Sequence, residues 1–194
     1  MPKETFLKVD LLYSTPNPLD IIESAIRICH DSEKQGDETR DTLILRIIKL
    51  GHESVLEHGL ATFKISGISR ACSHQLVRHR IASYSQRSQR YINESNFEYI
   101  MPPNVEKTAF RWAMEDACNY YKTLQKAGAT KEDARFVLPN ACTTDIIMTM
   151  NFRSLRHFLK ERLSPKAQWE IKNLAKEIHK ILLEIAGPVF CDIN

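Results

Sequence analysis

The sequence lacks the features that define membrane and secreted proteins. No apolar run among its 194 residues approaches the length of a membrane-spanning helix, so we expect no membrane partner. Residues 1–5 are not followed by an apolar core of the length that a signal peptide needs, and we therefore expect no targeting segment. No internal repeat and no low-complexity tract is visible, which argues against solenoid and fibrous proteins.

Cysteine is scarce and poorly spaced for cross-linking. The five cysteines are far apart, odd in number and without a CxxC pair. This usage indicates neither a disulfide framework nor a zinc knuckle, and it predicts a reducing, cytoplasmic setting. The cysteines are Cys29, Cys72, Cys118, Cys142 and Cys191.

The residues that are present have the proportions of a globular protein, with 43% apolar and 26% charged. A chain of this length can bury a sizeable core, so we predict one domain covering residues 1–194. Strands are predicted at residues 6–13, 60–66, 97–101 and 142–150. Helices are predicted at residues 18–30, 69–80, 104–126 and 164–187, with shorter helices ending near Gly51, Pro139 and Leu163. Strands and helices alternate without a βαβ rhythm, which predicts an α+β fold with an antiparallel sheet packed with several helices.

Some local assignments depend on the exact phase of these patterns. Periodicity assigns to the buried faces of their helices Ile21, Ile22, Ala25 and Ile28, Leu43, Ile44, Ile47 and Ile48, and Trp112 and Tyr120. In the strand at residues 60–66, Ala61, Phe63 and Ile65 alternate with Leu60, Thr62 and Lys64, which predicts a half-buried strand. Asn104 is predicted to cap its helix, and Thr130 with Asp133 resembles a capping box. Gly67 is predicted to end the strand before it, and residues 83–90 are predicted to form a loop.

Arginine is concentrated in residues 70–90. These 21 residues hold five of the 13 arginines and neither lysine nor carboxylate, so the stretch is +5 in a chain of net charge +3. A guanidinium binds phosphate or carboxylate through two parallel hydrogen bonds, whereas lysine is a point charge. We therefore predict a pocket for an anionic nucleotide. A solvated charged face and a nucleic-acid patch are the alternatives; the slightly acidic remainder of the chain and the uncharged residues 81–84 argue against both.

Several other polar residues have more than one interpretation. The predicted helix places Gln75 on one face with Arg78 and His79. The segment from His52 to His58 lacks the HExxH spacing of a helical zinc site, and without a third ligand we predict no metal. Arg135 stands alone in a short helix, where a snorkelling surface arginine is the usual case.

Five short motifs occur along the chain in a fixed order. They are His52-Glu-Ser-x-x-Glu57-His, Arg78-His-Arg-Ile-Ala-Ser-Tyr with Ser88-x-Arg90-Tyr, Ala134-Arg135-x-Val-Leu-Pro139, Asn151-x-Arg153-Ser-Leu with His157-Phe, and Arg162 before Ala167-Gln-Trp-Glu-Ile171. In kind and order they resemble the flavin-dependent thymidylate synthases, whose signature is similar to Arg78-His-Arg followed after seven residues by Ser88. The resemblance covers roughly residues 5 to 185.

That resemblance implies a reaction and an assembly. Members of the family convert dUMP to dTMP, with 5,10-methylenetetrahydrofolate as carbon donor, FAD as redox carrier and NADPH as reductant. They are homotetramers with active sites shared between subunits, so each cluster seen in one chain is expected to be part of a site. No nucleic acid is expected as a partner.

The resemblance also assigns residues. It assigns to the flavin Ser54, Arg78, His79, Arg80, Gln86, Asn151, Arg153 and His157. It assigns to dUMP Gln75, Leu76, Val77, Arg78, Gln86, Arg87, Ser88, Gln89, Arg90, Arg135 and Arg162, and it makes Arg162 the catalytic residue that activates uracil. Gln86 and His157 stand where some relatives have Glu and Asn, and both can still form hydrogen bonds.

The chemistry of uracil fits these residue types independently. Uracil must be activated before its ring accepts a one-carbon unit and a hydride, and one strategy uses a thiolate nucleophile. No cysteine here has a context that singles it out. An arginine that stabilises charge on the N3/O2 edge is the other strategy, so we expect Arg162 to act with hydride from reduced flavin and no enzyme nucleophile. Ser88 is then a binding residue, and Arg90 and Arg135 are candidates for the 5′-phosphate. A nucleotide sensor without turnover is the remaining alternative.

Overall fold

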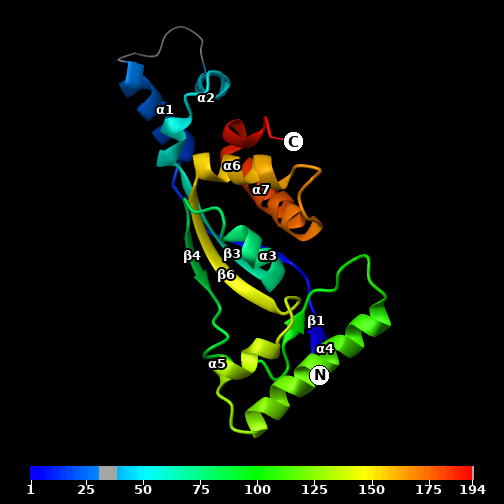
Figure 1. Cartoon of the computed structure of the whole chain (residues 1–194). Coiled ribbons are helices and arrows are strands. Elements are labelled where there is room, and N and C mark those ends of the chain that lie inside the picture. The colour runs from blue at the N-terminus through cyan, green and yellow to red at the C-terminus, as the bar shows by residue number, and fades with distance from the viewer. Residues whose placement is uncertain (31–38, 194) are drawn as a thin grey trace. The chain divides into compact units, whose positions relative to one another are not determined.

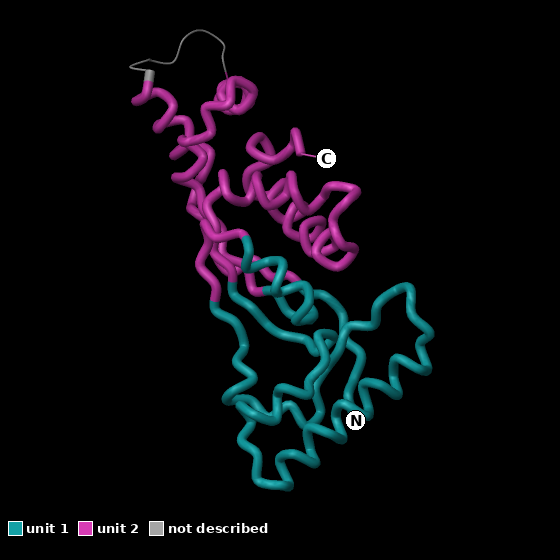
Figure 2. Tube along the Cα trace, viewed as in Figure 1, with its two compact units in different colours: residues 1–8, 65–78, 85–147 teal, residues 9–64, 79–84, 148–194 magenta. Residues whose placement is uncertain are grey.

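The computed structural model describes residues 1–30 and 39–193. Their backbone contacts divide the chain into two compact units, which Figure 2 shows in different colours. Unit 1 comprises residues 1–8, 65–78 and 85–147, and unit 2 comprises residues 9–64, 79–84 and 148–194. The predicted α+β class with an antiparallel sheet and several helices is confirmed (Figure 1). The assignment of residues 1–194 to one domain stays a prediction.

The main sheet has four strands in the order β2-β3-β6-β4. These are β2 (Lys8–Ser14), β3 (Leu60–Ser69), β6 (Thr143–Asn151) and β4 (Ser83–Gln86). Side chains alternate across a strand, and in β3 the predicted inward set Ala61, Phe63 and Ile65 is fully buried. Residues of both β3 and β6 belong to both units.

Gly67 was predicted to end β3, and this prediction is wrong. The strand continues to Ser69, with Gly67 inside it at a φ of 66°. A Cβ atom at this position would overlap the carbonyl oxygen of Phe6. Glycine here therefore permits both a left-handed backbone and the close approach of another segment of unit 1.

The helices of unit 2 pack on one another. They are α1 (Pro18–His30), α2 (Arg40–Lys49), the 3₁₀-helix η1 (Glu53–His58), α6 (Phe152–Arg162) and α7 (Trp169–Phe190). The predicted stripe of α2 is confirmed, since Leu43, Ile44, Ile47 and Ile48 are buried. In α1 the predicted inward Ile22 is fully buried, but Ile21 and Ile28, also predicted inward, are 40% and 81% exposed, and Ile26 is buried instead.

The last helix begins and ends later than predicted. Gln168 is its N-cap, and its side-chain oxygen accepts hydrogen bonds from the backbone N–H groups of Glu170 and Ile171. The helix also passes Pro188, with non-helical backbone angles at Ala186. Proline removes one backbone donor and bends a helix without always ending it.

A buried arginine links α6 to η1 and to the C-terminal residues of unit 2. Arg156 of α6 is 1% exposed, and its guanidinium donates to both oxygens of Asp192, at 2.6 and 2.7 Å. It also donates to the Glu53 carboxylate at 3.2 Å and to the carbonyl oxygen of Val189. This guanidinium holds the pKa of Asp192 below its usual value. The sequence pattern did not single out this residue.

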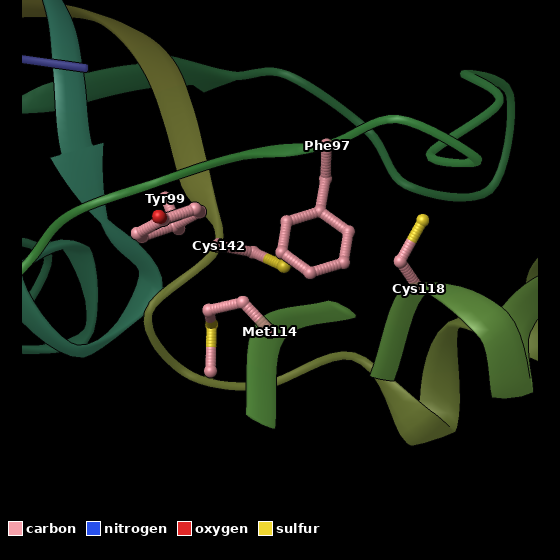
Figure 3. Packing of buried hydrophobic residues seen from close by; sticks show 5 residues of the cluster. All are labelled: Phe97, Tyr99, Met114, Cys118 and Cys142. Carbon is pink, nitrogen blue, oxygen red and sulfur yellow. The ribbon is translucent and has the colours of Figure 1, made fainter. Parts of the chain in front are cut away.

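Unit 1 contains the parallel pair β1 (Lys3–Glu4) and β5 (Glu98–Tyr99) and the helices α3 (Arg70–Leu76), α4 (Lys107–Lys126), α5 (Lys131–Ala134) and η2 (Arg135–Val137). One of its apolar clusters is formed by Phe97, Tyr99, Met114, Cys118 and Cys142, shown in Figure 3. The helix α4 buries one narrow face, Met114, Cys118 and Tyr121, at the i, i+4, i+7 spacing. Trp112 and Tyr120, predicted to be core, are each 64% exposed.

Helix ends in unit 1 follow the rules of capping. The predicted box at α5 is confirmed, because Thr130 Oγ1 accepts from the backbone N–H of Asp133 and donates to its carboxylate. At α4 the cap is Glu106 and not Asn104, since the Glu106 carboxylate accepts from the N–H groups of Thr108 and Ala109.

Across the described part of the chain, none of the helices combines the length and the apolar character that crossing a membrane requires.

Candidate functional site

The arginine-rich stretch folds differently from the prediction. Ser69 caps α3, accepting from the N–H of Cys72 at 3.0 Å, and the helix ends at Leu76 rather than near residue 80. Arg78 and His79 therefore lie beyond the helix, so the predicted face shared with Gln75 is wrong. The predicted loop contains a strand, β4.

The two sets of residues that the family resemblance assigns fall largely into different units. The dUMP set lies in unit 1 except for Arg162. The flavin set lies in unit 2 except for Arg78 and Gln86. Each set is therefore described in its own unit below.

Unit 1 contains a cavity of about 310 Å³ with a strongly basic lining. Arg70 and His74 of α3, Gln89 and Arg135 contribute its polar side chains, and no carboxylate is among the lining residues. The remaining lining residues are Phe136, Leu138, Pro139 and Asn140. Of the predicted dUMP residues, this cavity brings together Gln89 and Arg135.

Two nitrogen atoms of this lining are buried without a partner. Arg70 Nε and Gln89 Nε2 have no hydrogen bond to any described residue. A terminal nitrogen of Arg70 donates to the carbonyl oxygen of Arg87 at 2.7 Å, and burial lowers the pKa of the Arg70 guanidinium. An unpaired buried donor costs about 1–3 kcal/mol, so this lining favours a ligand that accepts hydrogen bonds.

The two arginines proposed for a 5′-phosphate differ in position. Arg135 lines the cavity, with its Nε donating to the carbonyl oxygen of Glu132 at 3.1 Å and its guanidinium over the ring of Phe136. Arg90 is not among the lining residues; it is exposed and pairs with the carboxylate of Glu132 at 2.8 Å. Within one chain, Arg135 is therefore the better placed of the two.

Gln86 of β4 is fixed by hydroxyl groups. Its side-chain Nε2 donates to Ser73 Oγ at 3.0 Å and to Thr144 Oγ1 at 3.3 Å. Ser88 Oγ accepts from the backbone N–H of Arg90 at 3.2 Å, which stabilises the turn after the strand. The amide nitrogen of Gln86 is thus used within unit 1.

Arg87 belongs to a partly buried charge network. Its guanidinium lies 3.5 Å from Glu94 and 3.8 Å from Asp145. Burial raises the pKa of Glu94, and the nearby Arg87 and Arg70 oppose that shift. Arg87 Nε and Glu94 Oε1 are also buried without a partner in the described structure.

At the end of α3, one of the four residues that the resemblance assigns to dUMP has no accessible side chain. Leu76 is fully buried, so a ligand could meet it only through backbone atoms. Gln75 is partly buried, while Val77 and Arg78 are exposed.

In unit 2, Arg162 forms a direct pair with His79. Arg162 Nε, at the end of α6, donates to His79 Nε2 at 2.9 Å. The His79 side chain is 7% exposed, and its ring meets Phe158 edge to face with centroids 5.1 Å apart. Burial, assisted by the positive charge of Arg162, lowers the pKa of His79 to about 4. The imidazole is therefore neutral near pH 7 and can accept this hydrogen bond.

Glu161 and His157 flank this pair. The Glu161 carboxylate lies 3.3 Å from His157 Nε2 and 3.9 Å from His79 Nε2. One ligand atom from each of these three residues falls within 4.8 Å of the others, which is close enough for a metal ion. The lone pair of His79 Nε2 already accepts from Arg162, so a cation would have to displace a positively charged donor.

The other residues of unit 2 that the resemblance assigns to the flavin either form contacts within the protein or are exposed. Asn151 Oδ1 accepts from the N–H of Ser154 and caps α6. Arg153 is exposed and pairs with Glu57 at 2.6 Å. Ser54 lines a second cavity, of about 160 Å³, and Arg80 is exposed.

Sequence reasoning missed Arg70, His74 and Glu161. Arg70 and His74 are four residues apart in a predicted helix, and that spacing would have placed them on one face. Glu161 is likewise four residues after His157. What distinguishes these residues from other charged pairs is the cavity or the side chains beside them, and these depend on the tertiary structure.

Known proteins resemble this chain over nearly its whole length. The family model described as thymidylate synthase complementing protein matches residues 10–187. A flavin-dependent thymidylate synthase of Geobacter sulfurreducens is 44% identical over 200 residues, 96% of this chain and 86% of that protein. One of Nitratidesulfovibrio vulgaris is 40% identical, over 98% of this chain and 87% of its own length.

A solved structure agrees with the sequence comparisons. Thymidylate synthase X from Helicobacter pylori, crystallised with FAD and dUMP, superposes with a TM-score of 0.82 at 31% identity. The match covers 97% of this chain and 99% of that one. Shared motifs, shared fold and identity over most of the length lead to one conclusion: the chain belongs to the flavin-dependent thymidylate synthase family.

Proposed function

We propose that this protein is a flavin-dependent thymidylate synthase that converts dUMP to dTMP by reductive methylation. The carbon donor is 5,10-methylenetetrahydrofolate, and NADPH reduces the FAD. The single observation that supports this best is the basic cavity of unit 1, where buried donors of Arg70 and Gln89 have no partner in the described residues. Relatives with this name and a neighbour structure with FAD and dUMP support the same reaction.

The cavity of unit 1 suits a phosphomonoester. Two guanidinium groups, Arg70 and Arg135, line it, and no carboxylate among the lining residues competes for them. Charge-assisted hydrogen bonds from arginine to phosphate are short and about twice as strong as neutral ones. We infer that this cavity binds the 5′-phosphate of dUMP, with Gln89 donating to the same ligand and Ser88 fixing the adjoining turn.

The donor set of unit 2 fits a flavin dinucleotide. Arg80 and Arg153 are exposed guanidinium groups suited to a diphosphate, and Ser54, Asn151 and His157 offer further hydrogen-bonding side chains. Asn151 also stands at the N-terminus of the 11-residue helix α6, where backbone N–H groups favour an anion. The resemblance also assigns Arg78 and Gln86 of unit 1 to the flavin. When bound, the flavin supplies the hydride that reaches uracil C6.

Arg162 is the residue that activates uracil in this proposal. Its Nε is held by His79, and its Nη2 lies 4.0 Å from the Glu161 carboxylate, which is beyond hydrogen-bond distance, so the terminal nitrogens can still donate to the N3/O2 edge of the ring. A preorganised guanidinium there stabilises negative charge as it develops, without waiting for solvent to reorganise. The carbon acceptor at C5 thereby becomes electron-rich.

The cysteines support a route without an enzyme nucleophile. Burial strongly raises the pKa of Cys142, so its thiolate is not available near pH 7. Cys72 and Cys118 are also buried, and Cys118 Sγ–H donates to the carbonyl oxygen of Ser95. Cys29 and Cys191 are exposed; Cys29 lines the smaller cavity of unit 2 with Ser54, and neither cysteine is among the residues that the resemblance assigns to dUMP.

We further propose a homotetramer in the cytoplasm whose active sites use residues of more than one subunit, with dUMP and folate as ligands. The resemblance to a family of homotetramers with shared active sites supports this assembly. Light scattering on a sizing column should give four times the 22.4 kDa chain mass, and a monomeric active enzyme would contradict this.

The test of the function is spectroscopic and then chemical. Purified protein, or protein reconstituted with FAD, should be yellow, and its flavin absorption should bleach on addition of NADPH. It should then release tritium from C5-labelled dUMP only when methylenetetrahydrofolate is present. A protein that cannot take up FAD would overturn the proposal, and FAD and dUMP binding without tritium release would indicate a sensor.

A further inference from the structure

We propose that His79 is a positioning residue for Arg162, acting as a neutral hydrogen-bond acceptor that aims the guanidinium at uracil. This inference rests on the proposed function for the role of Arg162. The family resemblance assigns His79 to the flavin. Orienting Arg162 would be a second role of the same residue.

The direct hydrogen bond between Arg162 and His79 is the first observation that supports a positioning role. Arg162 Nε donates to His79 Nε2 at 2.9 Å, and the residues are 83 positions apart in the chain. An Arg side chain has several rotatable bonds, and a bond at Nε fixes the plane of the guanidinium while leaving its terminal nitrogens available. Such a bond requires the imidazole tautomer with its proton on Nδ1.

The surroundings of His79 keep the ring in place. Phe158 packs against it edge to face at 81°, and the centroid of His157 lies 6.0 Å away. Tyr84 of β4 donates its hydroxyl to the backbone carbonyl of His79 at 3.0 Å. The ring is thus held from α6 and the backbone from β4.

The charged and titratable groups around His79 favour its neutral form. Arg162 and His157 oppose protonation, Glu161 at 3.9 Å favours it, and burial has the largest effect. Tyr84 is neutral near pH 7 because burial raises its pKa further above the ordinary value. A protonated His79 would present an N–H to Arg162 and break the bond.

The first experiment needs neither substrate nor flavin. Nitrogen-15 spectra of the histidines in the full chain should show His79 neutral at pH 7, protonated on Nδ1, with its Nε2 shifted by an accepted hydrogen bond. Arg162→Met removes the donor and its charge, so the pKa of His79 should rise and the Nε2 shift should change. A proton on Nε2 in the wild type, or an unchanged spectrum in Arg162→Met, would overturn the proposal.

The second experiment compares two substitutions of the same residue. His79→Phe keeps a ring without an acceptor, and kcat should fall about 10- to 100-fold because the guanidinium loses its orientation. His79→Gln places an oxygen near the former Nε2 and should recover most of kcat. His58→Gln, at an exposed histidine of the same unit, is the matched control.

The kinetic outcomes separate positioning from flavin binding. Flavin content is measured by absorbance for every variant, and kcat is taken per bound flavin. Equal kcat values in His79→Phe and His79→Gln would refute the positioning role. A wild type with the expected spectrum but no turnover of dUMP would refute the proposed function and leave the His79–Arg162 pair intact.

Discussion

Unit 1 and unit 2 differ in whether their buried polar side chains have hydrogen-bond partners. In unit 2, Arg156 is almost fully buried and donates to Asp192, Glu53 and a backbone carbonyl. In unit 1, four side-chain atoms are buried without a partner among the described residues: Arg70 Nε, Arg87 Nε, Gln89 Nε2 and Glu94 Oε1. All four belong to the arginine-rich stretch or contact it.

This difference separates structural charge from charge that awaits a ligand. A buried ion pair with its hydrogen bonds made holds segments together, as Arg156 does for α6 and the C-terminal end. Buried donors without acceptors destabilise the ligand-free protein and become favourable when an anion binds. Arg162 is a third case, since its Nε donates to His79 and its Nη2 lies 4.0 Å from the Glu161 carboxylate, while its side chain stays 22% exposed.

The largest expected effect is on turnover. Arg162→Ala removes the charge that stabilises the activated uracil, and kcat should fall by about 10²–10³ or more. Tritium release from labelled dUMP measures this, while absorbance shows that FAD is still bound. Arg111→Ala, which removes an exposed arginine of unit 1, is the control and should retain activity. Near-normal turnover in Arg162→Ala would refute its catalytic role.

A matched pair of substitutions tests the comparison of buried arginines. Arg156→Met breaks a fully bonded guanidinium and should lower the free energy of unfolding by about 3 kcal/mol. Arg70→Met removes the unpaired Nε together with one hydrogen bond to the Arg87 carbonyl, and because these two effects oppose each other the change should stay within about 1 kcal/mol. Urea unfolding of the ligand-free protein measures both. Equal losses would show that the two units do not differ in this respect.

The same Arg70 variant should behave differently toward ligand. Arg70→Met and Arg135→Ala should each weaken dUMP binding by about 1.5–3 kcal/mol, because each removes a charge-assisted bond to phosphate. Calorimetric titration with dUMP, compared with deoxyuridine, assigns the loss to the phosphate. If Arg70→Met binds dUMP normally, then the basic cavity of unit 1 is not the phosphate site.

The smallest expected effect is the dependence of stability on pH. Because the folded pKa of His79, about 4, is below its ordinary 6.5, the unfolded chain binds this proton first as pH falls. The contribution of His79 is therefore complete above pH 6.5 and is lost as pH falls toward 4. Between pH 7.5 and 6 this amounts to about 1 kcal/mol or less. Urea unfolding of wild type and His79→Gln should show a difference that shrinks on acidification, whereas a constant difference would contradict the shift.

Local patterns in the sequence predicted much of the fold. The alternation of β3, the apolar stripe of α2 and the capping box at Thr130 were all confirmed. Each depends on residues within one or two turns of each other, so the information is contained in a short segment. The order of the five motifs was likewise readable and indicated the family.

Which face a helix buries could not be predicted as well. Trp112 and Tyr120 are exposed although they fit an apolar stripe, because α4 covers its core with a narrow face. Gly67 lies inside a strand because Phe6, distant in sequence, approaches its backbone. Such outcomes depend on the partner segment, which periodicity does not contain.

For the candidate site, the sequence by itself determined the residue types, their order along the chain and the concentration of arginine between residues 70 and 90. Only the tertiary structure decided that Arg70 and His74 line a cavity with Arg135, that Arg156 is a buried structural ion pair, and that His79 accepts a hydrogen bond from Arg162. The physical reason is that burial and hydrogen bonding between distant residues arise only when the chain has folded, and these two effects decide whether an arginine stabilises the protein or remains available to a ligand.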